Sequence, residues 1–183
     1  MKRGPERRRS FGHSSSRSAL SRSVPALLAG AVACSAPLAL ADNGNTVVPN
    51  NARLNNSVYV NINTAQRQNG CTTDSKMDNR LTDAARRHTL DVLNTPDING
   101  DVGSDGSTPQ DRARDAGFRG RAAETVAIVP SLAINGIQIL GQWWWDPPSR
   151  ALMQDCANTA IGVWSENSLN RSVLVAMYGQ PSM

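Results

Sequence analysis

An apolar segment rich in small residues, 24–41, divides this chain of 183 residues into two unlike parts. It follows a start rich in Arg and Ser, and it ends in Ala39-Leu40-Ala41, the A-x-A pattern that precedes signal-peptidase cleavage. We interpret residues 1–41 as a secretory signal peptide. Pro25, Pro37 and the scarcity of large apolar side chains argue against the alternative, a retained membrane anchor. The part expected to fold is therefore the remaining 142 residues.

Two short motifs in the signal segment bear on the export route. Arg8 to Phe11 (RRSF) resembles the start of a twin-arginine signal. Ala31 to Cys34 (AVAC) loosely resembles a lipobox, in which Cys34 would be lipidated and become the mature N-terminus. Because the apolar stretch continues past Cys34 to Ala41, we favour cleavage after Ala41 and a secreted or envelope location.

The formal charge of +4 belongs to the signal segment. Residues 1–41 hold seven of the 19 basic residues and one of the 15 acidic ones, so the remainder carries 12 basic and 14 acidic residues, a net of −2. In the remainder, Arg112, Arg114, Arg119 and Arg121 alternate with acidic residues, which indicates a mixed solvated surface. We therefore expect no nucleic-acid partner. No apolar run in the remainder approaches the roughly 20 residues of a membrane span, so we expect membrane contact to be peripheral at most.

Removal of the signal leaves two thiols, Cys71 and Cys156. In an oxidising compartment such a lone pair is most simply a disulfide, here closing a loop of roughly 85 residues. The alternative is two buried free thiols.

The spacing of apolar residues predicts helices followed by an antiparallel sheet, an α+β pattern. Residues 42–54 are polar and are interpreted as a leader or linker before a domain over 55–181. The expected helices contain Val58, Ile62 and Ala65 up to Gly70, then 77–93, a short helix capped by Thr108 with Pro109 in its first turn and closed by Gly117, and 131–145, stopped by Pro147-Pro148. The expected strands are 123–130, 160–164 and 172–178, the last two forming a hairpin.

Candidate catalytic residues are few. His88 is the only histidine after residue 41, so a Ser–His–Asp arrangement would have to use it, yet no serine lies in a G-x-S-x-G motif. His88 also falls on the inner face of its helix, where a packed, hydrogen-bonded role is the simpler interpretation. Glu124 stands in an apolar context, so it must find partners or raise its pKa. It is either a functional acid or a structural hydrogen-bond anchor, and we favour the anchor.

Two further motifs, at 97–101 and 143–145, are candidate binding sites. Asp97 to Asp101 (DINGD) resembles the start of a calcium loop, but Val102 and Thr108 stand where that loop needs Gly and Glu, so we interpret it as a turn. Trp143-Trp144-Trp145 cannot all face one way on a helix. We expect Trp144 to be buried and Trp143 or Trp145 to be partly exposed. An exposed tryptophan is a candidate contact for carbohydrate, lipid or protein, but we favour the alternative, packing against the two prolines.

The motifs in their order resemble those of the CAP superfamily, also called the SCP-like or cysteine-rich secretory, antigen 5, pathogenesis-related-1 family. The carrying residues are Asn63 to Arg67, Leu81 to His88, Gly103 to Ser107, Pro109, Asp111-Arg112, Ala116 to Phe118, Ala123-Glu124, Trp144 before Pro148, and Ile161 to Val163. The resemblance covers roughly 55–181 and implies a three-layer α-β-α sandwich.

The resemblance also implies a degenerate cavity. The family's cavity typically carries two His and one or two Glu that can hold a divalent metal. Glu124 matches the Glu, but Asp101 and Arg150 stand at the two His positions. The resemblance therefore predicts no metal and no cofactor, with His88, Asp101, Glu124 and Arg150 as candidate cavity residues. Glu124 or Asp101 is expected to pair with Arg150 and fill the cavity by charge neutralisation.

These observations predict a secreted, non-enzymatic CAP-domain protein that binds an envelope ligand, either a lipid or a protein partner. Family members have been associated with sterol and lipid binding, which the resemblance permits. One alternative is a secreted hydrolase, which requires His88 and Glu124 to lie within hydrogen-bond reach. The other is a purely structural envelope protein, favoured if the groove near Glu124 is closed.

Overall fold

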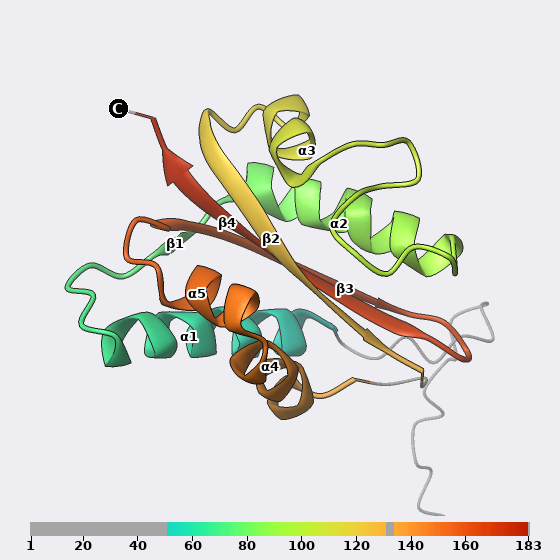
Figure 1. The fold of residues 1–183 in the computed structure, drawn as a ribbon, viewed down its shortest axis with the longest axis horizontal. Helices are drawn as coiled ribbons and strands as arrows, with labels where there is room; N and C mark the ends of the chain where they lie inside the picture. The colour runs from blue at the N-terminus through green and yellow to red at the C-terminus, as the bar shows by residue number, and fades with distance from the viewer. Residues whose placement is uncertain (1–50, 131–133, 183) are drawn as a thin grey trace, which may run out of the picture. The chain divides into compact units, whose positions relative to one another are not determined.

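The computed structural model describes residues 51–130 and 134–182, so the expected signal peptide and most of the leader lie outside the described residues. The described part contains, in chain order, α1 (Asn51–Gln68), β1 (Lys76–Met77), α2 (Asn79–Asn94), α3 (Pro109–Asp115), β2 (Gly120–Val129), α4 (Gly136–Trp145), α5 (Pro147–Gln154), β3 (Ala160–Asn167) and β4 (Ser172–Pro181) (Figure 1). None of its helices is both long and apolar enough to cross a membrane.

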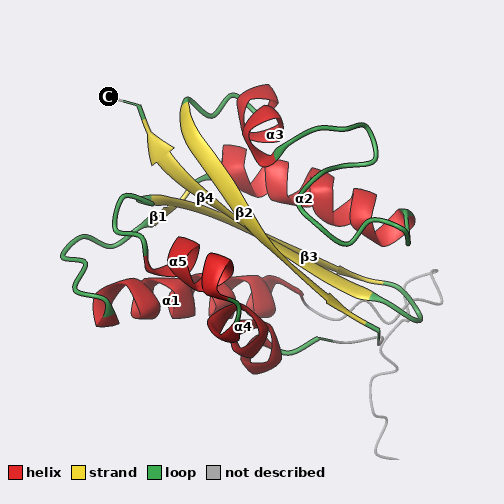
Figure 2. Cartoon of the chain, viewed as in Figure 1, coloured by secondary structure: helices red, strands yellow, loops and turns green. Residues whose placement is uncertain are grey.

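The strands form one sheet in the order β1-β3-β4-β2 (Figure 2). The short β1 runs parallel to β3, while β4 pairs antiparallel with both β3 and β2. Helices α2 and α3 cover one face, and α1, α4 and α5 cover the other (Figure 1). The domain is therefore the expected α+β, three-layer α-β-α sandwich, and β2 is an edge strand.

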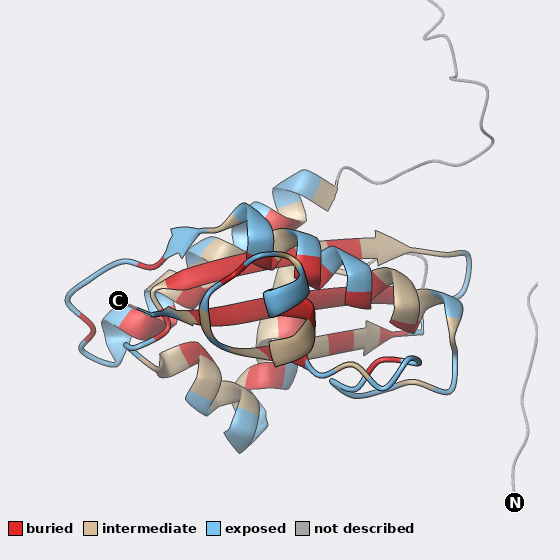
Figure 3. Cartoon of the chain, turned by 90° about the horizontal axis from the view of Figure 1, so that it is seen from above, coloured by how far each residue is buried: buried red, intermediate tan, exposed pale blue. Residues whose placement is uncertain are grey.

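The sheet separates two apolar cores, one on each face. The central strand β4 belongs to both, and its residues from Ser172 to Gly179 are all buried, so its sequence shows no alternation of apolar and polar side chains. In Figure 3 the buried residues follow the strands, and the exposed ones lie on the outer faces of the helices and in the loops. Both helical layers therefore pack against the same sheet, one on each face.

Local sequence signals set most helix ends. Gly70 has a φ of 91° just after α1, and Gly117 has a φ of 85° after α3, both in the left-handed region that glycine adopts freely. Thr108 and Asp111 form the reciprocal capping box at the start of α3. These expected helix boundaries are confirmed.

Three sequence expectations about the elements are corrected. Helix α1 begins at Asn51, inside the expected leader, and α2 begins at Asn79 because Met77 belongs to β1. Pro147-Pro148 does follow the end of α4, but it also opens α5, which was not expected. Proline has no backbone N–H, so it cannot continue α4. In the first turn of a helix that N–H would have no partner anyway, so the same two prolines can begin α5.

The two cysteines form the expected disulfide, Cys71–Cys156, with a Cα–Cα distance of 5.3 Å. It joins the turn after α1 to the end of α5 and closes a loop spanning 85 residues. In the chain-entropy model, a loop of this length stabilises the folded state by about 4–5 kcal/mol. The expected disulfide is therefore confirmed, and the alternative of two buried free thiols is wrong.

The contact between α2 and β3 depends on a glycine. A Cβ on Gly162 would lie 2.2 Å from the carbonyl carbon of Leu81 and 2.3 Å from the amide nitrogen of Thr82. Both are backbone atoms, so they cannot move aside as a flexible side chain would. Gly162 therefore allows the backbone of α2, which carries His88, to approach the sheet closely.

We expect Gly162→Ala to lower the free energy of unfolding by more than about 3 kcal/mol, because the new methyl group must push α2 off the sheet. Gly141→Ala is the matched control, since nothing lies within 4 Å of a Cβ there. In helix α4 it should stabilise by about 0.5–1 kcal/mol. Urea unfolding measures both, and equal effects of the two substitutions would contradict the close α2–β3 contact.

Candidate functional site

Three charged or polar side chains from three elements meet between the sheet and the α2–α3 layer. They are His88 of α2, Arg112 of α3 and Glu124 of β2, with side-chain exposures of 0%, 1% and 0%. The Nε2 atom of His88 lies 3.2 Å from Oε1 of Glu124, and Nη2 of Arg112 lies 2.7 Å from the same oxygen. We call these three residues the buried centre. The hydrogen-bond reach that the hydrolase alternative requires is met.

The hydrogen bonds indicate which tautomer His88 adopts. Its Nε2 also lies 3.0 Å from the carbonyl oxygen of Gly100, which can only accept, so we assign the proton to Nε2. Burial lowers the pKa of His88, which favours the neutral ring. The basic lone pair is then on Nδ1, which is buried and has no hydrogen-bond partner among the described residues. In this state His88 anchors a loop carbonyl and presents no base to a substrate.

Arg112 connects the loop between α2 and α3 to strand β2. Its Nη1 donates to the carbonyl oxygen of Ser107 at 2.6 Å and to the Ser107 hydroxyl at 3.1 Å. Its Nη2 donates to the carbonyl oxygen of Asp101 and to Oε1 of Glu124, both at 2.7 Å. One buried guanidinium therefore holds both ends of the segment 101–107, and the Glu124 carboxyl faces its charge.

The environment of Glu124 opposes its ionisation. Burial raises the pKa of Glu124 to about 8, although the charge and hydrogen bond of Arg112 act in the opposite direction. One carboxyl oxygen, Oε2, is buried without a partner among the described residues, which is consistent with a carboxyl that ionises with difficulty. Glu124 has both the partners and the raised pKa that its apolar sequence context predicted.

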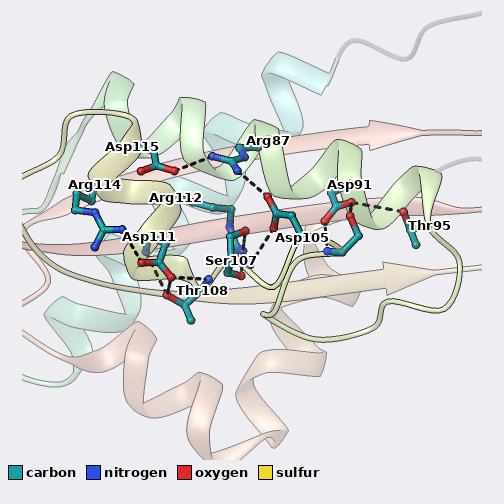
Figure 4. A network of polar contacts seen from close by, with 11 residues as sticks. Arg87, Asp91, Thr95, Asp105, Ser107, Thr108, Asp111, Arg112, Arg114 and Asp115 are labelled. Carbon is teal, nitrogen blue, oxygen red and sulfur yellow. Dashed lines mark hydrogen bonds and ion pairs between the residues drawn. The ribbon is translucent and has the colours of Figure 1, made fainter.

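A second polar network, drawn in Figure 4, fixes the outer side of the same loop. The carboxylate of Asp91 in α2 accepts from the amide and the hydroxyl of Ser104, at 2.8 and 2.6 Å. Arg87, also in α2, donates to Asp105 and to Asp115 (Figure 4). A Cβ on Gly103 would lie 2.8 Å from both Asp105 Oδ1 and Ser107 Oγ, so glycine permits this compact turn. The loop is therefore held from α2 and from α3.

The structure places the other predicted cavity residues away from the expected ion pair. The Asp101 residue is exposed, and its backbone carbonyl rather than its carboxylate reaches the buried centre. Arg150 lies half-buried in α5, in the helical layer on the opposite face of the sheet from α3. The expectation that Glu124 would pair with Arg150 is wrong, because Arg112 is the cation that donates to Glu124.

Arg112 was missed because its neighbours in sequence suggested a solvated surface. Its position carries a signal that points inward, since Pro109, Arg112 and Ala113 recur at helical spacing and are all buried in α3. An arginine on the buried side of a short helix requires an acceptor, and Glu124 was the buried carboxylate available. The spacing could have placed Arg112 on the buried side of α3, whereas its pairing with Glu124 follows from the packing of α3 against β2.

The three tryptophans differ from the expectation in two respects. Trp145 is 81% exposed, as one of the two candidate contacts was expected to be. The prediction that Trp143 is a surface contact is wrong. It is 2% exposed and donates its indole N–H to the carbonyl of Val126 at 3.2 Å. Trp144 is only half-buried. Helix α4 is thus rotated so that Trp143 faces the sheet.

A groove of about 390 Å³ lies beside the edge strand β2. Three apolar side chains line it together with amides, a hydroxyl, a carboxylate and a guanidinium: Val126, Ile128 and Trp143, with Asn99, Gln142, Asp146, Ser149 and Arg171. Arg171 also donates to the carbonyl of Ile98 at 2.7 Å, which fixes the loop wall of the groove. Because this loop is the one held by the buried centre, we take the β2 groove as the candidate binding site.

Comparison with known proteins identifies the fold. No family model and no curated protein sequence matches the chain. Among solved structures, an outer surface protein from Borrelia burgdorferi matches with a TM-score of 0.63 at 15% identity, over 74% of this chain and 98% of that one. An extracellular SCP-domain protein from Bacillus anthracis matches with a TM-score of 0.57 at 15% identity, over 70% of this chain. A cysteine-rich secretory protein from Staphylococcus aureus matches with a TM-score of 0.50 at 12% identity, over 74% of this chain.

The last two matches cover only 41% of the longer chains to which they belong. Together with the α-β-α architecture, these likenesses show that the domain has the CAP, or SCP-like, fold. The fold expected from the order of the sequence motifs is confirmed.

The residues present do not fit the metal that this fold family implies. A divalent ion at Glu124 would lie beside the guanidinium of Arg112, which is 2.7 Å from Oε1 of that carboxyl and would repel the ion. The resemblance places Asp101 and Arg150 at the two His positions, but Asp101 is exposed and Arg150 lies on the opposite face of the sheet from α3. Within the described residues, no group of three or more His, Cys, Asp and Glu side chains is arranged to hold a metal ion.

We expect the carboxyl of Glu124 to titrate near pH 8. A carboxyl with a pKa raised from 4.5 to about 8 by folding holds its proton more tightly in the folded chain. Its stabilising contribution is therefore complete below pH 4.5 and is lost as the pH rises to 8. Relative to Glu124→Gln, the free energy of unfolding of the unsubstituted protein should fall between pH 5 and 8.

Carbon-13 NMR of glutamate-labelled protein measures the same quantity directly. The chain after residue 41 has two glutamates, Glu124 and Glu166, and the signal absent from Glu124→Gln identifies Glu124. A Glu124 carboxyl that titrates below pH 5 would contradict the raised pKa.

Proposed function

We propose that the chain is an exported, non-enzymatic CAP-fold protein that binds an amphipathic small ligand at the cell envelope. Export is supported by the A-x-A-terminated segment 24–41 and the Cys71–Cys156 disulfide. It is further supported by two of the structural neighbours, an outer surface protein and an extracellular protein.

The observation that carries the non-enzymatic proposal is the burial of the buried centre. His88 and Glu124 are close enough to act together, but neither side chain is exposed to solvent. The Nε2 proton of His88 is directed to a backbone carbonyl, and the Glu124 carboxyl accepts from Arg112. A general base must reach the proton that it abstracts from a substrate, and this geometry supports an internal anchor instead.

The β2 groove supports the binding part of the proposal. Ligand sites typically combine apolar walls with a few polar groups that orient the ligand, and this groove has both. Its apolar residues, Val126, Ile128 and Trp143, suit a hydrocarbon portion. The amides of Asn99 and Gln142 and the cation of Arg171 suit a polar head group. An amphipathic lipid-like molecule combines such a hydrocarbon portion with such a polar head group.

We expect the exported, oxidised protein to hydrolyse p-nitrophenyl acetate and a fluorescent casein no faster than buffer does. Glu124→Gln should give the same background rate, since the carboxyl takes no part in turnover. Circular dichroism and the melting temperature would show that the variant is folded. Turnover by the unsubstituted protein that a folded Glu124→Gln variant loses would establish the hydrolase alternative instead.

We expect a dansyl-labelled fatty acid to bind saturably, with energy transfer from tryptophan because Trp143 lines the groove. Gln142→Trp places a bulky side chain in the groove and should weaken binding at least about tenfold, a difference of 1.4 kcal/mol. Gln138→Trp is the matched control, one turn away on the same helix and outside the groove lining.

Two outcomes would change the proposal. Equal effects of Gln142→Trp and Gln138→Trp would remove the β2 groove as the site. The absence of saturable binding would favour the protein-partner form or the purely structural alternative, to which the closed buried centre already lends support.

A further inference from the structure

Helix α4 exposes two large apolar side chains along one line of its surface. Ile137 is 87% exposed and Trp145 is 81% exposed. They are eight residues apart with Gly141 midway, so all three lie on one helical face, and the two side chains are separated by about 12 Å along the helix. We call Ile137, Gly141 and Trp145 the α4 face. In Figure 2, α4 lies at the outer edge of its helical layer, away from α2 and α3.

The helix that carries the α4 face is uncharged, and the nearest charge in sequence is the exposed Asp146, which follows Trp145 directly. Residues 125–145 contain no Asp, Glu, Lys or Arg, and the exposed side chains between Ile137 and Trp145 are the neutral amides of Gln138 and Gln142. Solubility normally favours charges on an exposed helix, and large apolar side chains gathered there mark an interaction surface. The partner that complements this face is itself without strong net charge.

The area of the face argues against a protein partner or a second copy. A buried aromatic side chain covers about 150–250 Å², so Ile137 and Trp145 together supply no more than about 400 Å². A stable protein–protein interface buries roughly 800 Å² on each partner. A lipid surface needs no such complementary area, because it deforms around a few inserted side chains, and tryptophan favours the interface between acyl chains and water.

We propose that the α4 face docks the domain on a zwitterionic lipid surface, with Ile137 and Trp145 inserted at the level of the head groups. The absence of Lys and Arg from 125–145 means that attraction to anionic lipid does not drive this contact. Gln142 lies three residues before Trp145 and lines the β2 groove, so docking brings the groove beside the lipid. The contact does not require the groove to be occupied.

The test is flotation of the exported, oxidised protein with phosphatidylcholine vesicles at millimolar lipid. The unsubstituted protein should partition to the vesicles, and Ile137→Gln and Trp145→Ser should each weaken partition about tenfold, since each removes a large inserted side chain. Leu169→Gln is the matched control, because Leu169 is an 89% exposed apolar residue in the β3–β4 turn, outside the α4 face. It should change partition less than twofold. Melting temperatures should be unchanged in all three, since the substituted side chains are exposed.

Several results would overturn the proposal. One is the absence of partition by the unsubstituted protein, and another is an equal loss in Leu169→Gln. Partition that appears only with phosphatidylglycerol and disappears in 0.5 M salt (on the order of a 4 Å Debye length) would show an electrostatic contact elsewhere. A dimer in light scattering that Ile137→Gln or Trp145→Ser dissociates without lipid would make a second copy the partner. Gln142→Trp should keep vesicle partition, so failure of the groove and failure of the α4 face are distinguishable.

Discussion

The contact between Arg112 and Glu124 holds together the part of this domain that a ligand would meet. A buried guanidinium is unfavourable unless its charge and its N–H groups find partners. Here the partners are one carboxyl and the backbone carbonyls of Asp101 and Ser107. The same contact therefore offsets the burial of Arg112 and satisfies loop carbonyls that would otherwise lack hydrogen bonds. The course of the loop, and with it one wall of the β2 groove, depends on this arrangement.

This arrangement also explains how a site can contain catalytic residue types without being arranged for catalysis. His88 and Glu124 are neighbours, as in many acid–base pairs, but their hydrogen bonds are directed at the protein itself. The protonated nitrogen of His88 donates to the carbonyl of Gly100, and Arg112 donates to Oε1 of Glu124. The buried centre therefore fixes the loop between α2 and α3.

Much of the fold was predictable because its signals are local. Helical spacing located α1 and α2, the capping box located α3, and the spacing of apolar runs located the β3–β4 hairpin. Helix α5 was not anticipated, because two prolines were interpreted only as a stop signal. The expectation that Trp144 is the buried tryptophan also failed, since Trp143 faces the sheet and periodicity within a helix does not say how the helix is rotated against the sheet. Only contact with β2, through Val126, decides that rotation.

For the candidate site, the sequence identified the two residues whose context was unusual, His88 and Glu124, and the disulfide that a lone cysteine pair implies. It did not identify Arg112 as the partner of Glu124, because Arg112 lies among surface arginines in the sequence. Only its place on the inner side of α3 distinguishes it from them. The sequence by itself determined most of the elements, the bridge and the uncharged stretch 125–145. The tertiary structure alone decided which charges were buried together and which apolar side chains stayed exposed, because both depend on how distant segments pack on the two faces of one sheet.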